Sequence, residues 1–203
     1  MQKYRVLLFI YSVGFMWSAI HPHDYYTWIL EVFPAIIGLV VIVSTFKSFP
    51  LTYLTYCLIL FHCMVLFVGG HYTYAEVPLF DWIKDTLHQN RNNYDKLGHF
   101  TQGFVPAIII REIYIRKDIV KKGGWLSFLT ICTCLSISAC YEFLEWFVAV
   151  SSGQSSESFL GTQGYIWDTQ SDMLYATIGA ICAIISLSKI QNKNIEALIA
   201  QKT

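Results

Sequence analysis

Charged residues are scarce in this sequence of 203 residues, where Asp, Glu, Lys and Arg together make up only 14%. A soluble domain normally carries about 25% charged residues, whereas 55% of the residues here are hydrophobic. The few charges stand in short clusters between long apolar runs, which is typical of a chain that has lipid as its solvent. The composition therefore excludes an ordinary soluble domain and predicts a membrane protein.

The sequence also lacks a net charge and lacks cysteines in polar loops. Its 14 basic and 14 acidic residues cancel, so nothing indicates a nucleic-acid partner. All six cysteines lie inside apolar runs, and we therefore predict no disulfide framework. The length fits one compact bundle, a single transmembrane domain over residues 1–203.

Six apolar stretches are long enough to cross a bilayer, whose core needs about 20 helical residues. They are predicted at about 4–20, 28–46, 51–70, 95–115, 125–150 and 168–188. The first has no small-residue cleavage site and is interpreted as a signal anchor. The predicted fold is an all-α, polytopic membrane helix bundle of six transmembrane helices, with a short, frayed polar tail from Gln191.

Basic residues are distributed unequally between the two predicted membrane faces. One face holds Lys3, Arg5, Lys47, Arg116, Lys117, Lys121, Lys122, Lys189, Lys193 and Lys202, and the other holds only Lys84, Arg91 and Lys96. Because lysine and arginine are retained on the cytoplasmic side, both termini are predicted to be cytoplasmic. Loops 21–27, 71–94 and 151–167 are then expected to face outward.

Acidic and histidine residues gather at the predicted outer ends of four spans. They are His71 on the third span, Asp95 and His99 on the fourth, Glu142 and Glu145 on the fifth, and Asp168 and Asp172 on the sixth. Spacings of three or four residues put each pair on one helix face. Because charges at such depth usually face a bundle interior or an aqueous cavity, we predict one shared polar site.

The donor set of this site suits a divalent metal. Imidazoles together with carboxylates are ligands for Zn, Mn or Fe(II). The predicted metal ligands are His71, His99, Glu142, Asp168 and Asp172, and the predicted catalytic residues are Glu145 and Asp95, each as a general base or a partner of a ligand. The metal would activate water or polarise a lipid or envelope-precursor phosphate or ester at the outer leaflet, beneath the aromatic loop 71–94 as a lid.

Other interpretations stay open. Asp95 is placed to cap its helix, and Glu142 or Glu145 is placed to form a structural ion pair with Lys96 or Arg91. For the whole chain, a proton- or cation-coupled transporter and a non-catalytic membrane scaffold compete with an enzyme. The sequence does not decide between these three classes.

Three long strings occur together in the second half of the chain. They are His71-Tyr-Thr-Tyr-Ala-Glu-Val-Pro78, Arg91-Asn-Asn-Tyr-Asp-Lys-Leu-Gly-His-Phe100 and Gly161-Thr-Gln-Gly-Tyr-Ile-Trp-Asp-Thr-Gln-Ser-Asp-Met173, with Glu142-Phe-Leu-Glu145 between the last two. With these strings the chain closely resembles the YjdF family of bacterial inner-membrane proteins over about residues 71–180. The resemblance implies a multi-pass protein of the inner membrane and names no reaction.

A more distant resemblance starts from the same residues. Asp95-Lys-x-x-His99-Phe at a helix start, followed by a glutamate helix and an aspartate helix with a later glycine, is similar to the VanZ-like proteins. Those proteins are linked to resistance against glycopeptide antibiotics. The arginine and asparagine of the last VanZ segment have no obvious match in this sequence.

Overall fold

The protein is all-helical in the computed structural model, which describes residues 2–152 and 162–200. Those residues form seven α-helices and one 3-10 helix: α1 (Gln2–Ala19), α2 (Tyr25–Thr45), α3 (Tyr53–Tyr72), η1 (Tyr74–Glu76), α4 (Pro78–Thr86), α5 (Tyr94–Arg116), α6 (Gly124–Ser152) and α8 (Asp168–Ala200). Each predicted span falls on one of the six long helices, which confirms the all-α fold class. Part of the predicted outer loop 151–167 lies outside the described residues. Lys202 also lies outside them.

Four of the long helices, α2, α3, α6 and α8, are long and apolar enough to cross a membrane. The surface of the bundle agrees with this, because large apolar side chains cover it. Phe33, Val40, Phe143 and Trp146 are each more than half exposed. A soluble monomer rarely exposes so much contiguous apolar surface, and lipid is the solvent that such a surface needs. All six cysteines are free, as predicted.

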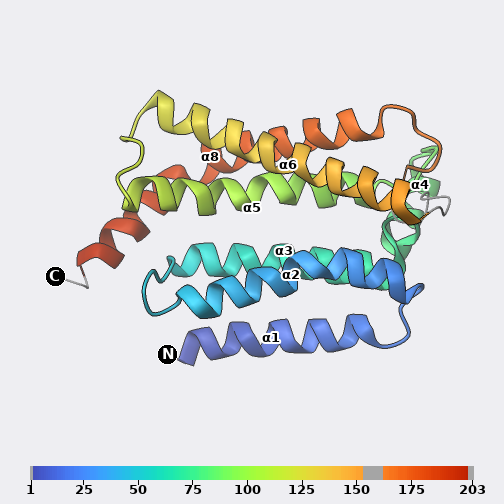
Figure 1. Ribbon diagram of the computed structural model, residues 1–203, viewed down its shortest axis with the longest axis horizontal. Coiled ribbons are helices and arrows are strands. Elements are labelled where there is room, and N and C mark those ends of the chain that lie inside the picture. Colours follow the sequence, from blue (N-terminus) through green and yellow to red (C-terminus); the bar gives the residue numbers. More distant parts are fainter. Residues whose placement is uncertain (1, 153–161, 201–203) are drawn as a thin grey trace.

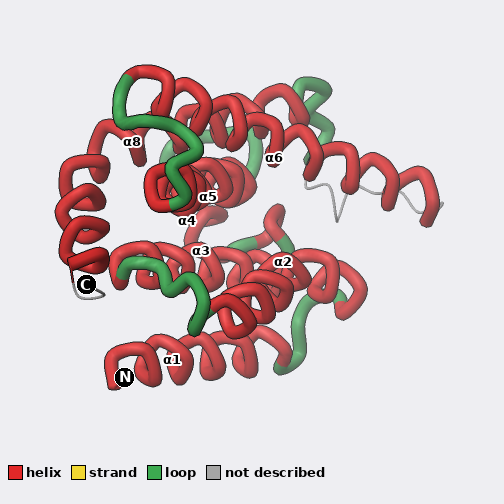
Figure 2. The backbone as a smooth tube through the Cα atoms, turned by 60° about the vertical axis from the view of Figure 1, so that its left-hand side comes forward, coloured by secondary structure: helices red, strands yellow, loops and turns green. Residues whose placement is uncertain are grey.

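The long helices lie side by side along the longest axis of the molecule, in two layers (Figure 1). One layer holds α1, α2 and α3, and the other holds α5, α6 and α8, with α3 packed against α5 (Figure 2). The start of α1 and the end of α8 lie at one end of the bundle, whereas α4 lies at the opposite end (Figure 1). We refer to these as the terminal end and the α4 end.

Helix α5 is the centre of the second layer and packs against α3, α6, α8 and η1. Its contact with α8 is the closest, because two glycines let the backbones meet. A Cβ atom at Gly103 would collide with the backbone of Ala176, and one at Gly179 would collide with the backbone of Phe100. Small residues of this kind are typical of tightly packed helices in membranes. The close approach brings the polar face of α5 against that of α8.

The C-terminal tail differs from the prediction. Residues from Gln191 were expected to be frayed, but α8 continues without a break to Ala200. Gln191 is fully buried: its side-chain amide donates to the carbonyl oxygen of Ile108 at 2.6 Å and accepts from Arg111 Nη1 at 2.8 Å. The prediction was wrong because a polar tail stays helical when its side chains satisfy buried groups of a neighbouring helix.

Candidate functional site

The α4 end of α5 is fixed by side chains just before and inside its first turn. Asn92 is fully buried, donates to the carbonyl oxygen of Val77 at 3.0 Å and accepts from the backbone N–H of Tyr94 at 3.1 Å. The Tyr94 hydroxyl donates to the carbonyl oxygen of Val65 on α3 at 2.9 Å. The helix begins after Asn93, so Asp95 is not its N-cap. The Asp95 carboxylate is therefore available to other groups.

Lys96 joins three aspartates from two helices. Its ammonium group donates to Asp95 Oδ2 at 3.2 Å, to Asp168 Oδ1 at 2.9 Å and to Asp172 Oδ1 at 2.5 Å. Arg91 adds a 2.7 Å bond to Asp168 Oδ1. Lys96 and the three aspartates are all buried. The ion pairs expected between Lys96 or Arg91 and the glutamates of α6 are thus made with aspartates of α5 and α8 instead.

The remaining oxygens of two of these aspartates face one imidazole nitrogen. His99 Nε2 lies 3.2 Å from Asp95 Oδ1 and 3.8 Å from Asp172 Oδ2. The three ligand atoms of Asp95, His99 and Asp172 all lie within 4.8 Å of one another. Because metal–ligand bonds to N and O are about 2.0–2.2 Å, ligands that share an ion must converge in this way. We call this trio the His99 cluster.

Glu142 approaches the same imidazole from its other side. Its Oε1 atom lies 3.9 Å from His99 Nδ1, which is itself 3.1 Å from Gln102 Oε1. Glu142 is only 7% exposed, and Oε1 has no hydrogen-bond partner among the described residues. A buried carboxylate oxygen without a donor is costly, so this position favours an additional proton or cation.

A cavity of about 180 Å³ adjoins the cluster and is lined by residues of α2, α3, η1, α5 and α6. Beside Asp95 and His99, its polar lining consists of Glu31, His62, Tyr74, Gln102, Tyr141 and Glu145. Tyr74, from the predicted lid segment, is buried, and its ring fills the space left by Gly69 and Gly98. Burial raises the pKa of Tyr74 well above its ordinary value, so its hydroxyl stays protonated.

Sequence reasoning did not include Glu31 in the site. Glu31 is buried, and it brings a carboxylate from α2 into the cavity. Its signal was present, because it is a charged residue about two turns inside a long apolar helix, where charges are rarely placed without a partner or a role. Helix α2 carries no second charged residue, so its sequence offers no pair on one face of the kind that marks the other helices of the site.

The structure does not bring His71 to the His99 cluster. The His71 ring stacks on Trp17 of α1 at 4.5 Å between centroids, and Nδ1 lies 3.2 Å from the carbonyl oxygen of Ser18. His71 shares the depth of the other predicted ligands but faces the first layer of helices. Of the remaining predicted residues, Glu145 lines the cavity, and Asp168 binds Lys96 and Arg91 at the edge of the trio.

The site as a whole has too few fixed positive charges for its acids. The carboxylates are Glu31, Asp95, Glu142, Glu145, Asp168 and Asp172, and the basic groups beside them are Arg91 and Lys96. Buried carboxylates cannot all ionise side by side without compensation. The arrangement therefore requires bound protons or a bound cation.

Comparison with known proteins agrees with the location that the sequence indicates. Residues 3–193 match the family model described as predicted membrane protein, DUF2238. The chain is 47% identical over 174 residues to inner membrane protein YjdF of Escherichia coli strain K12, covering 86% of this chain and 83% of that protein. No solved structure matches the chain. The chain therefore belongs to the DUF2238 family of predicted membrane proteins and is a multi-pass protein of the bacterial inner membrane.

Proposed function

We propose that the protein binds a divalent cation in the His99 cluster and uses it on a polar lipid or envelope precursor at the outer face of the inner membrane. The convergence of the Asp95, His99 and Asp172 ligand atoms within 4.8 Å carries the proposal. Two carboxylates and one imidazole suit Zn, Mn or Fe(II). Three protein ligands also leave positions for water and substrate, as catalytic metal sites require.

Lys96 supports this assignment because it orients two of the proposed ligands. It holds one oxygen of Asp95 and one oxygen of Asp172, and their other oxygens then face His99 Nε2. Groups that orient ligands are a regular part of metal sites. Asp168 acts through Lys96 and Arg91 in the same way, as a positioning residue.

Two glutamates of α6 have proposed roles beside the cation. Glu142 faces His99 Nδ1, where an acceptor would keep the proton on Nδ1 and leave Nε2 free to bind the metal. Glu145 lies across the adjoining cavity, where it would act as the general base toward a metal-bound water. Asp95 also lines the cavity. We assign it as a metal ligand and not as the general base, and it contacts His99 directly.

The proposed topology puts this site at the periplasmic face. We propose one transmembrane domain over residues 1–203, six spans, and both termini in the cytoplasm. The start of α1 and the end of α8 lie at the same end of the bundle, as an even number of spans requires (Figure 1). Most of the lysines and arginines belong to that end, which is the cytoplasmic preference.

The test is the metal content of the full chain, purified in detergent and measured by elemental analysis after loading with Zn, Mn or Fe(II). We expect about one ion per chain, lost in His99→Ala and in Asp172→Asn. His71→Ala is the matched control, a histidine at the same end of the bundle that should keep the ion. A folded wild-type chain that holds no ion after loading with any of the three metals overturns the proposal.

Transport is a second candidate, and one observation favours it. The cavity extends from Glu31 and Glu145 to His62, halfway along α3, and chains of acidic and histidine side chains within membranes mark proton or ion pathways. Proton or cation flux into tight proteoliposomes, abolished by His62→Ala, would favour this function. Stoichiometric metal without flux would favour the enzyme.

A further inference from the structure

A second cavity, of about 440 Å³, lies at the terminal end of the bundle, far from the His99 cluster. Its walls come from the first half of α1, the last turns of α2 and the first half of α3. Its size falls within the roughly 300–1,000 Å³ of ordinary ligand pockets. Neither the proposed metal nor its substrate uses this space.

The cavity lies where α1 and α2 make few contacts with each other while both pack on α3. Toward the α4 end the Trp28 indole donates to Ser18 Oγ at 3.1 Å, and farther along α1 the Tyr11 hydroxyl donates to the carbonyl oxygen of Ala35 at 3.1 Å. At the terminal end the Tyr4 ring meets the ring of Phe46, directly after α2, at 5.3 Å between centroids. Between these contacts the two helices leave a gap over α3, and the cavity occupies it.

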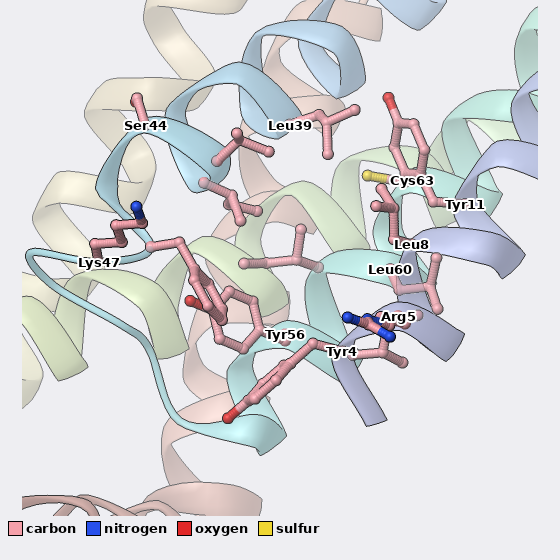
Figure 3. A pocket seen from close by; sticks show the side chains of 15 residues that line it. Tyr4, Arg5, Leu8, Tyr11, Leu39, Ser44, Lys47, Tyr56, Leu60 and Cys63 are labelled. Atoms are coloured by element: carbon pink, nitrogen blue, oxygen red, sulfur yellow. The ribbon is translucent and has the colours of Figure 1, made fainter. Parts of the chain in front are cut away.

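The lining changes from apolar to cationic along the cavity. Tyr11, Leu39, Leu60 and Cys63 surround its inner part, whereas Arg5 and Lys47 stand on different walls nearer the terminal end (Figure 3). Both basic side chains are exposed, and none of the ion pairs among the described residues uses either of them. A cavity with apolar walls and two basic side chains that form no ion pair complements a ligand that has a hydrocarbon chain and an anionic head group.

We propose that this cavity binds one anionic glycerophospholipid, with an acyl chain along the apolar walls and the phosphate group between Arg5 and Lys47. Basic pockets between membrane helices on the cytoplasmic side are suited to such head groups. In the proposed topology the lipid belongs to the inner leaflet, on the side opposite the metal. Lipid binding here does not depend on whether a metal binds to the His99 cluster.

The experiment is native mass spectrometry of the full chain released from detergent after titration with phosphatidylglycerol or with phosphatidylcholine. We expect one tightly bound phosphatidylglycerol and clearly weaker binding of phosphatidylcholine. Because each basic group near an anionic surface contributes about fivefold in affinity, Arg5→Gln with Lys47→Gln should weaken phosphatidylglycerol binding about 25-fold. The control, Lys189→Gln with Lys193→Gln, removes two exposed lysines of α8 and should leave binding unchanged.

A second pair of variants tests the cavity itself and keeps both charges. Ser44 lines the cavity and hydrogen-bonds only its own helix, at the carbonyl oxygen of Val41. Ser44→Trp should fill the space and abolish the bound lipid. Ser186→Trp is the matched control, since Ser186 is an exposed serine of α8 with the same kind of intrahelical bond, to the carbonyl oxygen of Cys182.

Three results overturn the proposal. Equal affinity for the two lipids shows that no anionic site exists. Equal loss in the α1–α2 and α8 charge variants shows diffuse attraction to the surface. A dimer that appears in the wild type as lipid is removed, and is lost in Ser44→Trp, shows that a second copy of the chain occupies the cavity instead.

Discussion

Both ends of α5 carry buried charged residues, but the two ends differ in how completely these residues are paired. At the terminal end, Glu112 is 0% exposed and each of its oxygens accepts two hydrogen bonds. The donors are the Thr52 backbone N–H, the Thr52 and Thr55 hydroxyls, and Arg116, at 2.6–2.9 Å. Nothing in this group is left unpaired, so it has the character of a structural lock between α3 and α5.

At the α4 end, acids outnumber fixed basic groups and the pairing is incomplete. Glu142 Oε1 has no partner among the described residues, and Asp95 and His99, which an oxygen of Asp172 also faces, line a cavity. A fully satisfied buried network specifies a structure, whereas an incompletely satisfied one marks a place where something binds or titrates. The difference between the two ends is the strongest physical reason to look for function at the α4 end.

The largest expected effect is at the terminal end. Glu112→Ala leaves Arg116 without its carboxylate and removes four hydrogen bonds, so we expect the free energy of unfolding to fall by about 3–5 kcal/mol. Thermal denaturation in detergent measures this. The folded fraction should keep the metal affinity of the wild type. A comparable loss in Glu196→Ala, whose pair with Lys122 is exposed, would remove the distinction between a buried lock and a surface pair.

The next effect is on cation affinity at the α4 end. Asp172→Asn keeps an oxygen that accepts from Lys96 but removes the charge that faces His99, and we expect the affinity for the divalent ion to fall at least about 100-fold. Isothermal titration of the metal-free protein gives the affinity. An unchanged affinity would show that Asp172 is not a ligand and that the ion binds at another site.

A smaller effect with an opposite sign on stability is expected at Glu142. Replacing Glu142 with Gln removes a buried acid whose Oε1 has no partner, so the metal-free protein should gain up to about 1 kcal/mol of stability. Metal affinity should fall about tenfold, because Glu142 no longer orients His99. Denaturation and metal titration of the same sample separate the two quantities. A stability loss as large as that of Glu112→Ala would show that the buried charges at both ends of α5 have a structural role.

The smallest effect is at an exposed acid, which serves as a reference for both ends. Asp24 caps α2 by accepting from the Thr27 backbone N–H at 2.7 Å, and this bond holds the pKa of Asp24 below its ordinary value. Asp24→Ala should cost about 1 kcal/mol or less of unfolding free energy. Because the pKa is lowered on folding, the contribution is present at neutral pH and is lost as the pH falls through the folded-state pKa. Denaturation at neutral and at acidic pH should show the difference between wild type and variant shrinking; a constant difference would contradict a charge-dependent cap.

Helix positions followed from the sequence because lipid imposes a simple length rule. The predicted fourth span, 95–115, differs from α5 by one residue at each end, and the predicted fifth, 125–150, differs from α6 by one and two. The rule that selects 20 apolar residues does not reach beyond the membrane, so it missed the extension of α8 to Ala200. That extension is stabilised by Gln191, which meets Arg111 of another helix.

The depth of the polar residues also followed from the sequence, but their direction did not. Counting residues placed His71 and His99 at the same end of the bundle, and both lie there. Helix rotation then decided their partners: His99 faces Asp95 and Asp172, whereas His71 faces Ser18 and Trp17 of α1. Neither rotation nor neighbour is encoded in a count of residues along one helix.

The sequence by itself determined that this chain is a helical protein of the inner membrane, because composition, span length and the family strings are local properties. Only the tertiary structure decided which acids share a site. The approach of α5 and α8 at Gly103 and Gly179 brings Asp172 to His99 and Lys96, and the cavity beside α2 includes Glu31. Side-chain convergence depends on interhelical packing, which depends in turn on residues far apart in the chain, and so a site of this kind is visible only once the helices are packed together.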